Sequence, residues 1–170
     1  MILCLTGLSC IGKTTVSKLL TEENNYTLLS MRKISHDLAI KHGYSRTRDW
    51  LKETSIKNYL SACRKAILLN ISKDNSNYVI DDLFDIELWN EIDSEYNSTL
   101  ISFSLPDEIR IARMQKRENL NFIDAQKELS FLDNCKKAFG IEKVINNASA
   151  HLEVSNLNPH EIMQLIHQYI

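Results

Sequence analysis

Gly7-Leu8-Ser9-Cys10-Ile11-Gly12-Lys13-Thr14-Thr15 is the stretch of the 170-residue chain that decides the fold. Its first eight residues have the spacing G-x-x-x-x-G-K-[ST], the pattern of a phosphate-binding loop. The apolar run Met1–Thr6 comes directly before the loop, and the helix-compatible segment Val16–Leu20 follows it. This order predicts a buried strand, a tight loop and a helix.

The spacing of the loop has a physical reason. Gly7 and Gly12 permit backbone angles and close approaches that a Cβ atom would block. The backbone N–H groups of the loop can then converge on an anion, helped by the positive end of the following helix. Lys13 is expected to reach the β- and γ-phosphates of a nucleotide, and the Thr14 hydroxyl to ligate Mg²⁺. The expected nucleotide-binding residues here are Gly7, Leu8, Ser9, Cys10, Ile11, Gly12, Lys13, Thr14 and Thr15.

Length and composition are typical of one globular domain, expected over residues 1–170. The net charge of −2, from 20 basic and 22 acidic residues, gives no overall positive field for general nucleic-acid binding. A local basic groove is still compatible with this charge. No apolar run is long enough to span a bilayer, so no membrane association is expected. Four cysteines without a C-x-x-C pair fit a reducing, cytoplasmic location.

Strand-like and helix-like segments alternate along the chain. The expected strands are residues 1–6, 26–30, 78–80 and 99–103, with a fifth at 151–155 in preference to 141–145. The expected helices are residues 13–22, 31–41, 49–71, 84–92, 106–118, 122–138 and 159–169, and a loop covers 74–77. This alternation predicts an α/β fold whose parallel sheet has helices on both faces.

Two carboxylates stand where the third expected strand ends. Asp81 and Asp82 directly follow Tyr78-Val79-Ile80. Ligands of parallel sheets bind beyond the carboxyl ends of the strands, so this pair should lie beside the phosphate-binding loop. A carboxylate there can hold Mg²⁺ or accept a proton from an attacking hydroxyl. Both aspartates are expected to be catalytic, and Asp81 is placed as a Walker B metal ligand. The sequence does not decide which aspartate has which role. The alternative is that the two aspartates only form a turn.

Basic residues mark two further parts of the expected site. Arg110, Arg113 and Arg117 share one helix face, as arginines on a lid closing over ATP would; a solvated basic face is the alternative. Further basic residues lie just after the second expected strand and between the two helices that follow it. A guanidinium group there could bind an acceptor phosphate or a nucleic-acid backbone. The candidates for this role, against simple surface charge, are Arg32, Lys33, Arg46 and Arg48. Asn156 follows the last strand, where a nucleotide base could lie.

In these motifs the chain resembles P-loop kinases of the nucleoside-monophosphate-kinase superfamily, which includes adenylate kinases, dephospho-CoA kinases and phage deoxynucleotide kinases. The resemblance covers nearly the whole chain in order: the loop at 7–15, the inserted helices at 31–71, the strand end at 79–82 and the segment 105–118. It implies the three-layer sandwich of P-loop NTPases, with a five-stranded parallel sheet of order 2-3-1-4-5.

The same resemblance implies ATP and Mg²⁺ as cofactors and transfer of the γ-phosphoryl group. It implies an acceptor-binding helical insertion at about 31–71 and a small helical lid at about 106–138. Lys13, Arg113 and Arg117 would then stabilise the charge of the migrating group.

The sequence departs from this family where the acceptor would bind. Met31-Arg32-Lys33-Ile34 replaces the acidic-plus-arginine signature after the second strand, and Asp82-Leu83-Phe84 replaces the aspartate, glycine and arginine that follow the third. The leading hypothesis is therefore an ATP- and Mg²⁺-dependent kinase of a nucleotide-like small molecule. The alternatives are a kinase acting on polynucleotide, for example on hydroxymethylated bases in phage DNA, and a nucleotide-dependent regulatory NTPase.

Overall fold

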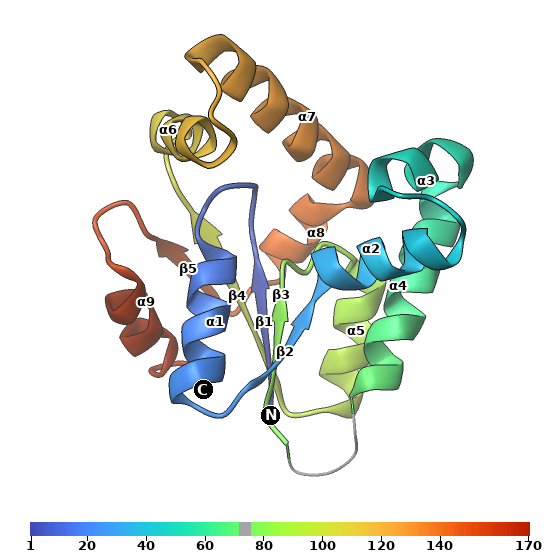
Figure 1. Cartoon of the computed structure of the whole chain (residues 1–170). Helices are drawn as coiled ribbons and strands as arrows, with labels where there is room; N and C mark the ends of the chain where they lie inside the picture. Colours follow the sequence, from blue (N-terminus) through green and yellow to red (C-terminus); the bar gives the residue numbers. More distant parts are fainter. Residues whose placement is uncertain (72–75) are drawn as a thin grey trace.

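The computed structural model describes residues 1–71 and 76–170, and in these residues five parallel strands form one sheet (Figure 1). The strands are β1 (Ile2–Thr6), β2 (Thr27–Ser30), β3 (Tyr78–Asp81), β4 (Ser98–Ser104) and β5 (Ala150–Glu153). Their order is β2-β3-β1-β4-β5, with every neighbouring pair parallel. The predicted fold class and strand order are therefore confirmed.

Helices cover both faces of the sheet. They are α1 (Lys13–Glu23), α2 (Met31–Lys41), α3 (Thr47–Glu53), α4 (Ile56–Asn70), α5 (Ile86–Glu95), α6 (Asp107–Glu118), α7 (Phe122–Phe139), α8 (Ile141–Asn146) and α9 (Pro159–Ile166). Helices α1 and α9 lie on one side, and α4, α5 and α8 on the other (Figure 1). The central strand β1 is buried on both faces, which explains why its sequence reads as a continuous apolar run.

Side chains of β1 alternate between the two cores that flank the sheet. Leu3 and Leu5 pack with residues of α1 and α9, whereas Ile2 and Cys4 pack with residues of α2, α4, α5 and α8. A third, smaller cluster joins α6 to α7 and includes Met114. These two helices lie beyond the carboxyl ends of the strands, above the loop that follows β1 (Figure 1).

The predicted single helix over 49–71 is wrong, because the structure has two helices there, α3 and α4. Thr54 and Ser55 adopt extended backbone angles between them, and the Ser55 hydroxyl accepts a hydrogen bond from the backbone N–H of Asn58. Serine is favoured at the first position of a helix, where its hydroxyl caps the backbone. Apolar residues at helical spacing on both sides of a serine therefore do not guarantee one continuous helix.

Other predicted boundaries shift by a few residues. The segment 141–145 forms α8 rather than a strand, directly after Gly140 ends α7 in a left-handed conformation, and the chosen fifth strand is confirmed. Helix α5 begins at Ile86, because Asp85 caps it, and α9 ends at Ile166 rather than near Tyr169. Part of the loop predicted over 74–77 lies outside the described residues.

No helix among those described combines the length and apolar character needed to cross a membrane.

Candidate active site

The loop between β1 and α1 has left-handed backbone angles at Gly7, Gly12 and also at Cys10, whose φ is +62°. Gly7 has φ +133°, and a Cβ atom there would lie 2.6 Å from the backbone oxygen of Phe103 in β4. Gly12, with φ +113°, stands at the start of α1. The turn and the close approach to the next strand therefore both exclude a side chain at Gly7.

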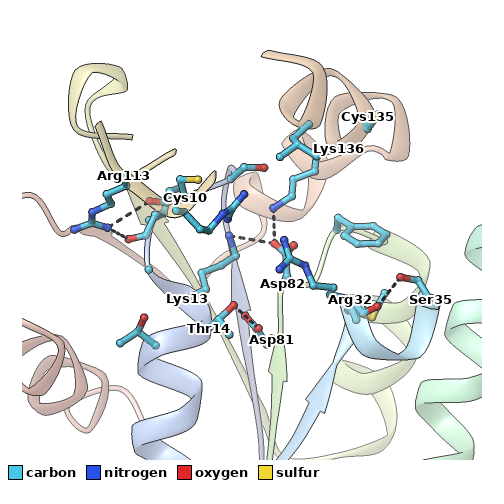
Figure 2. A pocket seen from close by; sticks show the side chains of 18 of the residues that line it. Cys10, Lys13, Thr14, Arg32, Ser35, Asp81, Asp82, Arg113, Cys135 and Lys136 are labelled. Carbon is cyan, nitrogen blue, oxygen red and sulfur yellow. Dashed lines mark hydrogen bonds and ion pairs between the residues drawn. The ribbon is translucent and has the colours of Figure 1, made fainter. Parts of the chain in front are cut away.

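Lys13 points back into the loop that precedes it. Its Nζ donates to the backbone oxygens of Gly7 and Leu8 at 2.8 and 2.7 Å, and it lies 3.1 Å from Asp82 Oδ1 (Figure 2). The ammonium group is buried yet fully engaged with protein oxygens. An anion bound in the loop would therefore compete for this ammonium with two carbonyls and one carboxylate.

Thr14 and Asp81 meet at the carboxyl ends of β1 and β3. Thr14 Oγ1 donates to Asp81 Oδ2 at 2.8 Å (Figure 2). Asp81 Oδ1 is buried and accepts no hydrogen bond from any described residue. Burial raises the pKa of this carboxyl, the Thr14 hydrogen bond lowers it, and the nearby Asp82 charge raises it. A buried oxygen without a partner is costly, and a cation would satisfy it.

The donor set fits Mg²⁺. This ion takes oxygen ligands, keeps several waters and is commonly bound through one or two protein groups plus substrate phosphates. Nowhere in residues 1–71 and 76–170 do three or more His, Cys, Asp or Glu side chains gather in a way that could hold a metal ion. Thr14 and Asp81 would therefore hold a divalent ion together with water and phosphate oxygens.

Asp82 has two lysine partners. Its Oδ1 lies 2.6 Å from Lys136 Nζ and 3.1 Å from Lys13 Nζ (Figure 2). Burial would raise the pKa of Asp82, but these two ammonium groups hold it well below its usual range. Asp82 adopts φ +71°, a left-handed conformation that aspartate and asparagine tolerate better than most residues. The carboxylate thus stays ionised at neutral pH and joins the loop after β1 to α7.

These groups line a cavity of about 870 Å³. One half is formed by the phosphate-binding loop, Asp81 and Asp82. The other half is formed by α2, α3 and α7, which contribute apolar and basic side chains. These are Met31, Arg32, Ser35, Thr47, Arg48, Leu51, Lys52, Phe131, Leu132, Cys135, Lys136 and Phe139, and Phe84 also lines the cavity. The cavity therefore connects the phosphate-binding loop with helices α2, α3 and α7 in one space.

Two of the three predicted lid arginines reach the cavity. Arg113 Nη1 donates to the backbone oxygens of Ile11 and Cys10, at 2.7 and 3.4 Å. Arg117 also lines the cavity, and its Nε is paired with Glu118 at 2.8 Å. The structure thus brings Arg113 to the phosphate-binding loop and Arg117 to the wall of the cavity.

Arg110, by contrast, is buried beneath the loop. Its Nε donates to the backbone oxygen of Ser9 at 2.9 Å, and its guanidinium also pairs with Asp107 and Asp133. Asp133 Oδ1 in turn accepts the backbone N–H of Ser9 at 3.0 Å. Asp133 and Arg110 therefore bind the backbone N–H and the backbone oxygen of Ser9, which fixes the shape of the loop.

We expect Arg110→Met to lower the free energy of unfolding by about 3 kcal/mol, because it leaves Asp133 and the Ser9 carbonyl without their buried partner. Urea denaturation at pH 7 measures the change. The matched control is Lys116→Met, an exposed cation of the same helix, for which a change within about 0.5 kcal/mol is expected. Equal stability of the two variants would contradict a structural role for Arg110.

The predicted acceptor-binding residues divide into two groups. Arg32 and Arg48 line the cavity. Lys33 pairs with Asp37 at 2.7 Å and Arg46 with Asp49 at 2.8 Å, and neither basic residue is part of the cavity lining.

Arg48 is held in place by α7, and Asn156 lies away from the cavity. Arg48 Nη2 pairs with Glu128 at 2.8 Å, and its guanidinium lies 4.3 Å from the centre of the Phe131 ring. This arginine therefore joins α3 to α7 across the cavity. Asn156 is exposed and does not line the cavity, although Leu157 does.

The sequence of residues 3–129 matches the family described as AAA domain. The chain belongs to this family. No curated protein sequence matches the chain. The AAA domain match contains the phosphate-binding loop, Asp81, Asp82 and the arginines of α6, and it ends within α7.

Solved structures share the fold of this AAA domain protein over almost its full length. Shikimate kinase from Aquifex aeolicus vf5 is 19% identical, with a TM-score of 0.62, over 99% of this chain and 94% of that one. Shikimate kinase from Acinetobacter baumannii, in complex with shikimate, is 18% identical, with a TM-score of 0.62, over 98% and 90%. An uncharacterized protein from Eubacterium ventriosum ATCC 27560 is 11% identical, with a TM-score of 0.71, over 99% and 96%. The fold is therefore that of P-loop kinases, as the sequence resemblance implied.

Two charged residues of this AAA domain protein's site, Asp133 and Lys136, are not predictable from the sequence pattern. Both lie on α7 and reach the loop after β1 from more than 120 positions away in the sequence. Their spacing, i and i+3, places them on one helix face, but the same face periodicity occurs on any amphipathic helix. Only the packing of α7 against the loop distinguishes them from surface charges.

Proposed function

We propose that this protein is an ATP- and Mg²⁺-dependent kinase that transfers the γ-phosphoryl group to a small, nucleotide-like acceptor. One observation carries the proposal. A single cavity contains the phosphate-binding loop with its Thr14–Asp81 pair in one half and an apolar, basic chamber in the other. A phosphoryl donor and an acceptor can thus meet in one cavity, which phosphoryl transfer requires.

Most of the predicted residues line the cavity at positions that suit their roles, whereas Lys33, Arg46 and Asn156 do not line it. The loop amides and Lys13 bind the phosphates, while Arg113 and Arg117 offset charge from the lid side. Thr14 and Asp81 hold Mg²⁺, which supplies neutralisation of the charge on the phosphate oxygens. We infer one kinase domain over residues 1–170, with the acceptor-binding insertion at 31–71 and the lid at 106–138.

Asp82 is assigned to the acceptor hydroxyl. Its two lysine partners make it a weak base, so its part is to orient the hydroxyl and to receive the proton only as the new bond forms. Phosphoryl transfer needs mainly positioning and charge stabilisation, so a carboxylate of low pKa suits this task.

The acceptor half of the cavity favours a molecule with a flat or apolar body and an anionic group. Phe84, Phe131 and Phe139 supply the apolar wall, and Arg32 and Arg48 the positive charge. A nucleotide has both features. A shikimate kinase with the same fold has been solved with shikimate, which supports a small-molecule acceptor here as well. The comparisons give no support to a nucleic-acid acceptor.

A panel of acceptors with ATP labelled on the γ-phosphate tests the proposal. It includes free nucleosides and nucleotides, dephospho-CoA, shikimate and hydroxymethylated DNA. Label transfer to a small acceptor that depends on Mg²⁺ is the expected result. ATP hydrolysis at the same rate with and without every acceptor would favour a regulatory NTPase and contradict the kinase proposal.

Asp81→Asn is expected to weaken Mg²⁺ binding about tenfold to a hundredfold, because the neutral amide keeps the shape but not the charge of the carboxylate. Turnover should therefore fall at limiting Mg²⁺ and recover as the Mg²⁺ concentration is raised. A titration of rate against free Mg²⁺ measures the shift. An unchanged half-saturating concentration would exclude Asp81 from the metal site.

A further inference from the structure

Lys136 comes from α7 but shares its partners with the lysine of the phosphate-binding loop. Its Nζ lies 2.6 Å from Asp82 Oδ1 and 3.2 Å from the backbone oxygen of Gly7. Lys13 Nζ bonds to the same two oxygen atoms, at 3.1 and 2.8 Å. The two ammonium groups therefore lie beside each other, on the cavity side of the loop (Figure 2).

Two lysines share one directly contacting carboxylate in this cluster, while Asp81 interacts with both lysines by its charge at longer range. Lys13 and Lys136 are both buried, and the one carboxylate that touches them is Asp82 among the residues the structure describes. Burial and the Lys13 charge lower the pKa of Lys136, and the Asp82 carboxylate only partly offsets them. Two neighbouring cations in a buried place repel each other, so an incoming anion would relieve an unfavourable arrangement.

The end of α7 that carries Lys136 is fixed against the loop. One turn earlier on the same helix face, Asp133 accepts the backbone N–H of Ser9 at 3.0 Å and pairs with the buried Arg110. The ammonium of Lys136 is thus positioned before any ligand arrives, which is what makes a charge effective in catalysis. Arg113 approaches the loop from its other side (Figure 2).

We infer that Lys136 is a second phosphate-binding lysine, whose ammonium contacts the γ-phosphate of bound ATP and stabilises it during transfer. This inference rests on the proposed function. Because Lys136 and Lys13 share the Gly7 carbonyl and the Asp82 carboxylate, any phosphate that draws Lys13 from these oxygens also faces Lys136. The migrating phosphoryl group would then lie among Lys13, Lys136 and Arg113, with Asp82 left free to orient the acceptor.

Nucleotide binding to Lys136→Met separates a γ-phosphate contact from a merely structural one. Calorimetric titration with Mg²⁺ compares ADP with the non-hydrolysable analogue β,γ-imido-ATP. Loss of a charge-assisted hydrogen bond should weaken the ATP analogue about tenfold to a hundredfold, while ADP affinity changes less than about threefold. Lys136→Arg, which keeps the charge, should restore most of the preference for β,γ-imido-ATP over ADP.

The matched control is Lys137→Met, because Lys137 is the exposed neighbour on α7 and does not line the cavity. It should bind both nucleotides as the parent does. Equal weakening of both nucleotides in Lys136→Met, or no weakening, would overturn the inference while leaving the proposed function in place. A parent protein that binds neither nucleotide would overturn both.

Thermal unfolding of each variant shows whether it is folded. If Lys136→Met does not fold, the parent structure with β,γ-imido-ATP decides the question. The expected result is Lys136 Nζ within hydrogen-bond distance of a γ-phosphate oxygen. An ammonium that stays on Asp82, away from the γ-phosphate, would overturn the inference.

Discussion

Lys13→Met is expected to transfer the γ-phosphoryl group at least about a thousandfold more slowly than the parent, with almost unchanged stability. Removing one preorganised donor from a site of developing negative charge typically costs a hundredfold to a thousandfold, and Lys13 would supply a full charge as well. Its Nζ already lies within the loop that would hold the phosphates, bonded to Gly7 and Leu8. The rate with saturating acceptor and labelled ATP measures the effect.

Stability should survive this change for a reason visible in the site. Methionine removes one of two adjacent buried cations, and Asp82 keeps its shorter ion pair, the one with Lys136. The control is Lys18→Met, an exposed lysine of the same helix, for which neither rate nor stability should change measurably. A Lys13→Met protein that is folded and as active as the parent would show that the chemistry takes place elsewhere.

The donor side of the site could be predicted from the sequence because its signals are local. The glycine spacing, Lys13 and Thr14 form one continuous motif, and Asp81 and Asp82 follow a buried strand whose end must lie at the same edge of the sheet. None of these local signals depends on how distant segments of the chain pack together. The structure accordingly places Thr14 against Asp81 and Lys13 against Asp82.

The acceptor side could not be predicted to the same depth, because neighbouring basic residues differ only in their direction. Arg32 and Arg48 line the cavity. Lys33 instead pairs with the exposed Asp37 of its own helix, and Arg46 pairs with the half-buried Asp49 of the helix that follows it. The sequence contains all four but no criterion for choosing among them. Lys136 was missed for a related reason, since its buried contacts are made across the fold.

Asp82→Asn is expected to lower the free energy of unfolding by about 3 kcal/mol at pH 7, because the two buried lysines lose the carboxylate that touches them. The estimate lies at the lower end of the range for a broken buried ion pair, since a quarter of the Asp82 side chain is exposed. Asparagine also tolerates the left-handed backbone at this position, φ +71°, so backbone strain should not contribute. Urea denaturation measures the loss, in buffer with EDTA so that metal binding to Asp81 does not contribute.

The pH dependence of this difference distinguishes charge from shape. Folding lowers the pKa of Asp82, so its contribution is complete above the ordinary carboxyl pKa of about 4 and is lost as the pH falls toward about 2. The parent and Asp82→Asn should therefore converge in stability over that acidic range.

Folding also lowers the pKa of Lys136, so burying this lysine costs stability at every pH where it is protonated. Raising the pH through the folded-state pKa of Lys136 relieves that cost. In Asp82→Asn, without the nearby carboxylate, the relief should begin at lower pH than in the parent.

Asp37→Asn provides the control for this pair of measurements. Asp37 is an exposed carboxylate paired with Lys33 on the surface, and its loss should leave the stability almost unchanged. A difference between the parent and Asp82→Asn that stays constant from pH 2 to pH 10 would show that Asp82 stabilises the fold by its shape rather than its charge. It would also remove the electrostatic reason for placing Lys13 and Lys136 at one phosphate, because that reason requires both lysines to be charged around an ionised Asp82.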